Sequence, residues 1–299
     1  MKMNWIKRTG IITAVVLTSG VLIHAVSGEI KKETTTATTK RYFPASVDFA
    51  GETTPLNISD VRERFDRELL VNANLDASTL LIIKRANRFF PVIEPILQKY
   101  GVPDDFKYLA VAESALMNAT SSAGAKGFWQ FMPATAKERG MEVNDEVDER
   151  YHLEKSTEAA CRYLLDAKSR LGSWTLAAAS YNGGLAGVNK QITSQGVSNY
   201  YDLLLTDETH RYVFRILALK EIMKNPTLYN FNVMPEELYQ GIPTKKVVVD
   251  SSVTDLAAFA KEQGINYKIL KIHNPWLRDK KLTNASKKRY ELEIPLSGY

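Results

Sequence analysis

One face of an expected helix combines apolar side chains with a single carboxylate, and this stretch constrains the 299-residue chain more than any other. Between residues 106 and 117, apolar side chains recur at helical spacing, and Glu113 is the only charged member of that face. Contact with apolar neighbours favours the neutral form of a carboxylate, so we expect burial to raise the pKa of Glu113. A general acid that works near neutral pH needs such a pKa. The face consists of Phe106, Leu109, Ala110, Glu113, Leu116 and Met117.

The residues after Glu113 predict a tight loop and a second helix. Gly124 and Gly127 permit positive φ angles and a close approach of backbone to a ligand. Pro133 suits the first turn of a helix over residues 134–139. A lone glutamate on an apolar face is more often a rim residue or an ion-pair partner than a catalytic acid. The aromatic residues and Gln130 beside it favour a sugar-binding site instead.

Charge and composition exclude several classes of function. The net charge is +5, from 39 Lys and Arg against 34 Asp and Glu, and the basic residues are scattered rather than clustered. We therefore expect weak attraction to anionic surfaces and no nucleic-acid partner. Cys161 is the single cysteine, which excludes an intrachain disulfide framework, and its helical context predicts a small buried hydrophobe. The four histidines are dispersed, so we expect no metal site and no cofactor.

The N-terminal region has the pattern of an export signal followed by a linker. Residues 1–27 combine a basic start with an apolar run over residues 11–26. That run has about the length of a signal-peptide core and is short for a membrane span. We expect either a signal peptide cleaved before Gly28 or an N-terminal anchor that tethers the chain through residues 6–26. Both place the protein in the periplasm or cell envelope, the anchor at the inner membrane. Residues 28–55 lack apolar periodicity and predict a flexible linker.

Residues 56–226 have the apolar periodicity of a mainly helical domain. A helix that Ser173 caps delivers Tyr181 and Asn182 at its end, before two glycines. Residues 142–149 are acidic, but their spacing places no second carboxylate opposite Glu113, so we interpret them as a solvated loop. The other expected helices cover residues 61–70, 79–88, 91–100, 156–171 and 214–224.

The C-terminal residues follow a different pattern. After a connector over residues 227–243, a β-branched strand over residues 246–249 precedes two short helices and a last strand over residues 290–294. The order β-α-α-β over residues 244–299 predicts a small α+β module.

Two motifs resemble those of lytic transglycosylases with the soluble lytic transglycosylase, or goose-type lysozyme, fold. The first is Glu113-Ser114 followed by Ser121-x-x-Gly124-Ala125-x-Gly127-x-Trp129-Gln130-Phe131-Met132-Pro133, and the second is Ser180-Tyr181-Asn182-Gly183-Gly184, with serine in place of the usual first alanine. Further matches, Asp148-Glu149-Arg150 and Glu208-Thr209-x-x-Tyr212-Val213, are similar to the D-type membrane-bound enzymes. The C-terminal module resembles LysM modules, although their usual Gly-Asp-Thr-Leu appears here only as the degenerate residues 250–256.

The resemblance implies a lysozyme-like helical domain that cleaves peptidoglycan and a LysM-like module that binds its glycan strands. It implies that Glu113 is the catalytic acid and base. The glutamic acid protonates the bond between N-acetylmuramic acid (MurNAc) and N-acetylglucosamine (GlcNAc) and then takes a proton from the muramyl C6 hydroxyl, which closes a 1,6-anhydro ring. Such an enzyme is a lyase and needs no second carboxylate. The substrate-binding residues that the resemblance implies are Ser121, Gln130, Tyr181, Asn182, Glu208 and Tyr212. We expect Trp129 to lie in the core.

Two alternative functions remain open at this point. A goose-type lysozyme-like hydrolase has the same fold and acid but uses water as the nucleophile. A non-catalytic wall-binding protein keeps the fold to hold glycan, although a binder has no need of an acid on an apolar face.

Overall fold

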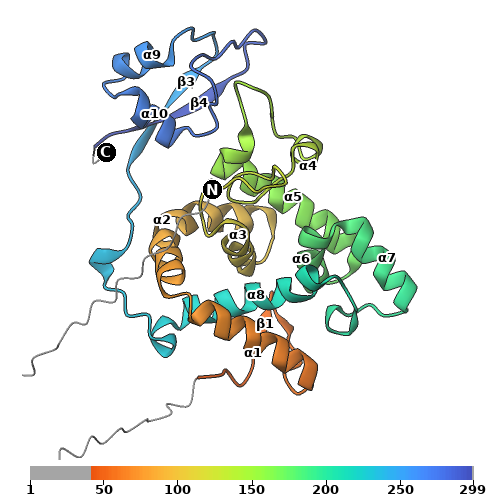
Figure 1. The fold of residues 1–299 in the computed structure, drawn as a ribbon. Helices are drawn as coiled ribbons and strands as arrows, with labels where there is room; N and C mark the ends of the chain where they lie inside the picture. The colour runs from red at the N-terminus through yellow and green to blue at the C-terminus, as the bar shows by residue number, and fades with distance from the viewer. Residues whose placement is uncertain (1–41, 298–299) are drawn as a thin grey trace, which may run out of the picture. The chain divides into compact units, whose positions relative to one another are not determined.

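The structure, a computed structural model, describes residues 42–297. The expected signal peptide or anchor and residues 28–41 of the expected linker lie outside this range. The described chain is mainly helical, with two small antiparallel two-stranded sheets. The predicted fold class is confirmed, because a helical domain is followed by a β-α-α-β module (Figure 1).

Helix α8 supports the helical domain, because it packs against α1, α3 and α6 (Figure 1). Ten of its residues are buried, which is typical of a helix that is covered on most sides. Glu113 lies on α3, so the packing of α3 against α8 fixes the position of the candidate acid. The α-helices are α1 (Ser59–Ala73), α2 (Asp76–Tyr100), α3 (Lys107–Ser114), α4 (Pro133–Glu138), α5 (Leu153–Leu171), α6 (Trp174–Gly183), α7 (Leu185–Gln195) and α8 (Asp207–Lys224). Short 3-10 turns are η1 (Asp104–Phe106), η2 (Glu149–Tyr151) and η3 (Tyr200–Asp202).

The expected helix ends agree with the structure at several positions. Gly172 follows α5 with a φ of 82°, and Gly101 follows α2 with a φ of 69°. The backbone N–H of Leu176 donates to the Ser173 hydroxyl at 3.0 Å, which caps α6. Pro133 is the first residue of α4. These ends were predictable because caps depend on a few neighbouring residues.

Helix α2 differs from the prediction, which divided it into two helices. It is continuous, with Pro91 and Pro95 inside it, and both prolines are exposed. Ile82, Ile93 and Leu97 are buried on both sides of Pro91. Burial of this shared apolar face offsets the hydrogen bonds that the prolines cannot make.

Residues 42–55 also differ from the prediction of a flexible linker. Strands β1 (Asp48–Phe49) and β2 (Glu52–Thr53) form a hairpin. The Phe49 ring is fully buried and lies 5.0 Å from the ring of Phe106, centroid to centroid. The Glu52 carboxylate accepts the backbone N–H groups of Trp174 and Thr175 at the start of α6, at 2.7 and 2.8 Å. Long-range partners therefore order a segment whose own sequence carries no periodicity.

The C-terminal module consists of β3 (Thr244–Val249), α9 (Leu256–Glu262), α10 (Tyr267–His273) and β4 (Tyr290–Pro295). The two strands pair antiparallel, from Thr244 opposite Pro295 to Val249 opposite Tyr290. The Asp255 carboxylate caps α9, and Asn266 caps α10. The predicted order of elements is confirmed.

Within the connector over residues 227–243, residues 237–240 lie along α2. The backbone N–H of Tyr239 donates to the Lys84 carbonyl at 3.1 Å, and Arg88 Nε donates to the Gln240 carbonyl at 2.8 Å. Both the module and the helical domain belong to the compact unit that begins at Tyr42. Within the described residues, no helix combines the length and the apolar character that a membrane span requires.

Candidate active site

Glu113 lies at the end of α3, one residue before the helix stops. Ala115 and Leu116 have left-handed φ angles of 52° and 56°, which turn the chain away at once. The expected apolar face is therefore helical only as far as Glu113. Leu116 is buried through this turn rather than through helical register, and Met117 is 44% exposed, so its expected place on the face is wrong.

Burial controls the protonation of Glu113. It raises the pKa of the carboxyl to about 7, from an ordinary value of 4.5. The phenol of Tyr212 donates to Glu113 Oε1 and lowers the pKa, as does the charge of Arg215, whereas Glu208 raises it. Near neutral pH the group is therefore divided between acid and carboxylate, so it can both give and take a proton.

Tyr212 is the hydrogen-bond donor to the candidate acid. Its side chain on α8 is 1% exposed, and burial together with the charge of Glu113 raises the pKa of the phenol well above its ordinary value. The phenol therefore stays a donor. We expected Tyr212 to contact substrate, but its position makes it a partner of Glu113 rather than part of the cleft wall.

Tyr181 and Asn182 lie together near the end of α6, as expected. The Tyr181 hydroxyl donates to the Trp129 carbonyl at 2.8 Å, and burial followed by the charge of Glu113 raises the pKa of its phenol. The Asn182 side-chain oxygen accepts from the Thr209 hydroxyl at 2.8 Å, which fixes the amide. Tyr181 is thus hydrogen-bonded to the loop that carries Trp129 and interacts electrostatically with Glu113. The Trp129 side chain itself is fully buried, as expected.

Ser121 and Gln130 belong to the loop over residues 119–131, which we call the active-site loop. The backbone N–H of Ala125 donates to the Ser121 hydroxyl at 3.0 Å, which closes a turn. Gln130 has a φ of 48°, and its side-chain NH₂ group donates to the Gly127 and Ala119 carbonyls at 2.7 and 3.1 Å. Both side chains are therefore bound within the loop, and each keeps an oxygen that can contact a ligand.

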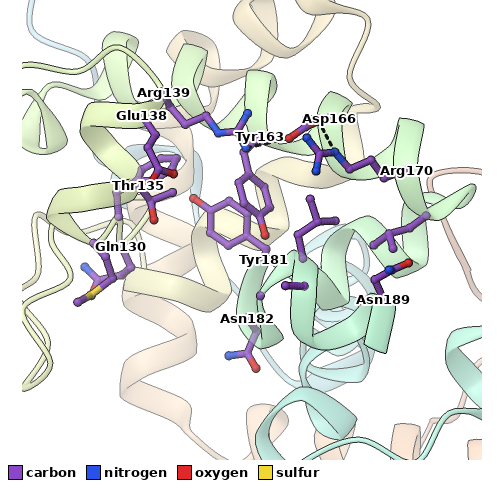
Figure 2. A pocket seen from close by; sticks show the side chains of 16 residues that line it. Gln130, Thr135, Glu138, Arg139, Tyr163, Asp166, Arg170, Tyr181, Asn182 and Asn189 are labelled. Atoms are coloured by element: carbon purple, nitrogen blue, oxygen red, sulfur yellow. Dashed lines mark hydrogen bonds and ion pairs between the residues drawn. The ribbon is translucent and has the colours of Figure 1, made fainter. Parts of the chain in front are cut away.

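A cleft of about 840 Å³ runs between α4, α5, α6 and α7. Gln130, Tyr181 and Asn182 line it, so the active-site loop and α6 meet there. Figure 2 shows Tyr181 near the middle of the cleft, and the ring of Tyr163 lies 5.1 Å from that of Tyr181. Glu113 is not part of the cleft wall, but besides burial its charge raises the pKa of Tyr181, which lines the cleft.

A cluster of three charges lies along the same cleft. Arg139 and Arg170 each contact the Asp166 carboxylate, at 2.9 and 2.8 Å (Figure 2). These contacts lower the pKa of Asp166, which therefore stays ionised. The cluster joins α5 to the end of α4 and shapes the cleft wall.

Glu208 lies at the start of α8 with a side chain that is 53% exposed. Its carboxylate accepts from Arg215 Nη1 at 3.1 Å. Arg215 Nε in turn lies 3.9 Å from Glu68, a carboxylate of α1 that is 1% exposed. Of the six predicted substrate-binding residues, Glu208 and Asn182 are exposed, and Glu208 lies within electrostatic reach of Glu113.

Comparisons with known proteins agree with this geometry. Residues 91–204 match the family model described as the transglycosylase SLT domain. Residues 245–298 match the model described as the soluble lytic transglycosylase C-terminal LysM-like domain. The chain contains a transglycosylase SLT domain and a LysM-like C-terminal domain.

Two curated relatives carry the resemblance to the D-type enzymes. Membrane-bound lytic murein transglycosylase D of Escherichia coli (strain K12) is 28% identical to the chain over 235 residues, which cover 76% of the chain. The protein of the same name from Escherichia coli O6:H1 matches to the same extent. The chain spans about half of their length, because the match covers 50% of each. The resemblance that the motifs predicted is confirmed.

Sequence reasoning missed the arginines around Glu68, of which Arg215 also acts on the pKa of Glu113. Glu68 contacts Arg211 Nε at 2.7 Å and Arg67 Nη1 at 2.5 Å, in addition to Arg215. The signal was present on α8, where Glu208, Arg211 and Arg215 recur at the spacing of one helix face. The α1 carboxylate that completes the network is distant in sequence, so no local pattern pointed to it.

Cys161 is fully buried, as expected, and burial raises the pKa of its thiol to about 12. A nucleophilic role is therefore unfavourable. Within residues 42–297, no group of three or more histidine, cysteine, aspartate or glutamate side chains is placed to hold a metal ion.

Proposed function

We propose that this chain is a peptidoglycan lytic transglycosylase. It cleaves the β-1,4 bond between MurNAc and GlcNAc without water, leaves 1,6-anhydro-MurNAc ends and serves in cell-wall remodelling or turnover. The observation that carries the proposal is Glu113, a largely buried carboxyl with a pKa of about 7 in an SLT domain, which interacts electrostatically with the cleft residue Tyr181. Such a group can be an acid and a base in turn at one pH.

In the first step, the protonated Glu113 gives its proton to the oxygen of the glycosidic bond. The bond between that oxygen and the muramyl anomeric carbon breaks, and the GlcNAc hydroxyl leaves. Positive charge develops at the anomeric carbon, where the acetamido group of the sugar stabilises it. This assistance by the substrate replaces the second carboxylate that most glycosidases use.

In the second step, the muramyl C6 hydroxyl attacks the anomeric carbon. Its proton passes to the Glu113 carboxylate, which restores the acid, so no water is consumed. Tyr212 stabilises the intermediate carboxylate, because its phenol donates to Glu113 Oε1. Hydrogen bonds to charged groups contribute about 1.5–3 kcal/mol, which corresponds to roughly 10- to 100-fold in rate.

Three of the remaining site residues, Gln130, Tyr181 and Asn182, line the cleft. Tyr181 places its ring and phenol oxygen beside the reacting sugar while its hydroxyl holds the Trp129 carbonyl. Gln130 and Asn182 offer oxygen and amide groups to the glycan, Ser121 offers a hydroxyl from the active-site loop, and Glu208 offers an exposed carboxylate on α8. The proposed catalytic residue is Glu113, and these residues bind the glycan.

A lysozyme-like hydrolase is the second candidate, and Glu208 is the observation that favours it. This carboxylate is exposed, and its charge adds to burial in raising the pKa of Glu113, so the two groups interact electrostatically. Its ion pair with Arg215 opposes a role as the base for water, because the carboxylate is already held by a cation. Glu208→Gln separates the two functions. A transglycosylase keeps most of its activity, whereas a hydrolase that uses Glu208 as its base loses it.

The decisive test is the chemistry of the products. Purified protein is incubated with peptidoglycan sacculi, and the released muropeptides are identified by mass spectrometry. Glu113→Gln is the test variant, and Glu138→Gln, an exposed glutamate in the same cleft, is the matched control. We expect anhydro-muramyl ends from the wild type and the control and none from Glu113→Gln. Reducing ends mean a hydrolase, and bound but intact sacculi mean a wall-binding protein.

We also propose that the protein works in the cell envelope, exported by residues 1–27 and either released into the periplasm or tethered through residues 6–26. The relatives are named as membrane-bound murein enzymes, and the LysM-like domain suits a glycan partner. Mass spectrometry of the N-terminus of protein from a membrane fraction distinguishes the cleaved from the tethered form. A full-length chain recovered from the cytosol would contradict both.

A further inference from the structure

The acidic segment over residues 142–151, which we call the junction segment, is not a solvated loop. It pairs with the C-terminal module along its backbone. The N–H of Asp148 donates to the Trp276 carbonyl at 2.9 Å, and the N–H of Arg278 donates to the Glu146 carbonyl at 2.7 Å. Val147 and Leu277 form an isolated antiparallel bridge, and Val147 is buried among the core residues of the module. The junction segment therefore forms part of the module's own core.

Side-chain hydrogen bonds and ion pairs also connect the junction segment to the module. The Glu146 carboxylate accepts the backbone N–H and the hydroxyl of Thr283, at 2.5 and 2.7 Å. Lys288 Nζ lies 2.5 Å from Glu142 and 3.2 Å from Glu149. The acids lie on the junction segment and the cation on the module, so the pairing is complementary.

The junction segment also holds the active-site loop, and Arg150 makes the contacts. Its side chain is 3% exposed and forms a two-pronged ion pair with Asp148, at 2.8 and 2.7 Å. Arg150 Nη1 donates to the carbonyls of Gly124 and Phe131, at 3.1 and 3.2 Å. A Cβ added at Gly127 would lie 1.8 Å from the Arg150 carbonyl oxygen, so the two backbones touch. The two ends of the glycine-rich turn, at Gly124 and Phe131, are thus hydrogen-bonded to one guanidinium.

The turn that Arg150 holds contains two groups of the candidate site, the Gln130 side chain and the Trp129 carbonyl. Gln130 is held by the carbonyls of Ala119 and Gly127, and the Trp129 carbonyl accepts the hydroxyl of Tyr181. Besides burial, the charge of Glu113 raises the pKa of the Tyr181 phenol, so the two groups interact electrostatically. A continuous set of contacts therefore runs from the module through the junction segment and the active-site loop to Tyr181.

We propose that Arg150 is a positioning residue for the reaction, and that the C-terminal module acts on the chemical step through it by holding the junction segment against the active-site loop. The inference rests on the proposed function and extends it. A module that only anchors the enzyme to glycan changes how much substrate binds. A module that positions the loop changes kcat, because small displacements of a site cost up to about 100-fold in rate.

The test uses the full chain with three substitutions. Arg150→Lys keeps the positive charge but loses the fork that reaches Asp148 and both carbonyls. Lys288→Ala loosens the junction from the module side, at a residue that is 41% exposed and therefore tolerant of change. Lys268→Ala is the matched control, because it removes the same charge from an exposed position on α10.

Three readouts are taken for each variant: the rate of muropeptide release at saturating sacculi, the binding of sacculi by sedimentation, and hydrogen exchange of residues 119–131 by mass spectrometry. We expect Arg150→Lys to lower kcat by about 10- to 100-fold and Lys288→Ala by a few-fold to about tenfold, with sacculus binding unchanged. Exchange within residues 119–131 becomes faster in both variants. The control changes none of the three.

The combined variant decides whether the module acts through Arg150. Arg150→Lys with Lys288→Ala is no slower than Arg150→Lys alone if both break one link, whereas independent effects multiply. An unchanged kcat in Arg150→Lys, or lower sacculus binding with unchanged kcat in Lys288→Ala, overturns the proposal. Hydrogen exchange keeps the inference separate from the proposed function, because coupling of module and loop is visible even in a protein that releases no muropeptide. If Arg150→Lys does not fold, Lys288→Ala tests the same link alone.

Discussion

Two carboxylates of the helical domain have opposite surroundings, and Glu68 is the more deeply buried of the two. Glu68 on α1 is 1% exposed and contacts Arg67, Arg211 and Arg215. Glu113 on α3 has a phenol as its hydrogen-bond donor, and burial is the largest effect on its pKa. A carboxylate that is buried with cations is a structural ion, whereas one that is buried beside a neutral donor keeps a usable proton. The difference between the two environments separates the scaffold from the candidate catalyst.

Exchanging each carboxylate for an amide should have different effects, on activity for Glu113 and on stability for Glu68. Glu113→Gln keeps the shape of the side chain and removes its proton. Loss of a general acid costs roughly 100- to 10,000-fold in rate, and we expect the upper end because one residue serves both steps. Thermal unfolding near neutral pH should show a fold that is intact. Activity close to that of the wild type would contradict the assignment.

Glu68→Gln should instead lower the stability, because an amide cannot form the ion pairs that the buried carboxylate makes with three partly exposed arginines. The expected loss in the free energy of unfolding is about 1.5–3 kcal/mol, the contribution of hydrogen bonds to charged groups. Denaturant unfolding measures it, with Glu63→Gln, an exposed glutamate on the same helix, as the control. A variant as stable as the wild type would show that Glu68 is not the structural partner in this comparison.

The pH dependence of stability tests the environment of Glu113 without any assay of activity. The pKa of Glu113 is about 7 in the folded protein against an ordinary 4.5, so the folded state binds more protons between these values. Stability should therefore fall as the pH rises from the lower to the higher value, by about 3 kcal/mol from this one group. In Glu113→Gln this fall disappears. Unfolding curves near pH 5 and near pH 8 should differ by about 3 kcal/mol less in the variant than in the wild type.

Tyr212→Phe tests the neutral donor. It removes the hydrogen bond that lowers the pKa of Glu113, so that pKa should rise further. Because the first step needs the protonated acid, the high-pH limb of the activity profile should move to higher pH. The maximal rate should fall by roughly 10- to 100-fold, as the intermediate carboxylate loses its donor. A profile that keeps its limb in place would mean that the phenol does not act on the acid.

Tyr181→Phe should give the smallest effect. It removes one hydrogen bond, to the Trp129 carbonyl, and leaves the ring in the cleft. Loss of about 0.5–1.5 kcal/mol corresponds to a decrease in kcat of roughly two- to tenfold. Tyr163→Phe, whose hydroxyl donates to the Ser180 carbonyl at 2.6 Å, is the control within the same cleft. Equal effects in both variants would exclude a special role for the Tyr181 hydroxyl.

The sequence predicted those parts of the molecule that depend on near neighbours. Glu113, the caps at Ser173 and Gly172, and the β-α-α-β order of the module all follow from spacing within a few residues. The left-handed turn at Ala115 was not predictable in this way, because neither alanine nor leucine favours a positive φ. Packing against the rest of the fold imposes it.

The features that were missed depend on partners far along the chain. Phe49 packs on Phe106, Glu68 pairs with arginines of α8, and Glu146 binds residues of the module more than a hundred positions later. Each looks like an ordinary apolar or acidic residue in its own segment. Local periodicity gave the candidate acid, but only the assembled fold separates its environment from that of Glu68.

In the proposed mechanism, Glu113 alone drives a cleavage in which no water takes part. The most direct measurement is digestion of sacculi in heavy-oxygen water, followed by mass spectrometry of the muropeptides at the new chain ends. We predict ends that are one water lighter than hydrolytic products and that carry no heavy oxygen. Reducing ends that contain one heavy oxygen atom would show that water attacked the anomeric carbon, and would contradict the account.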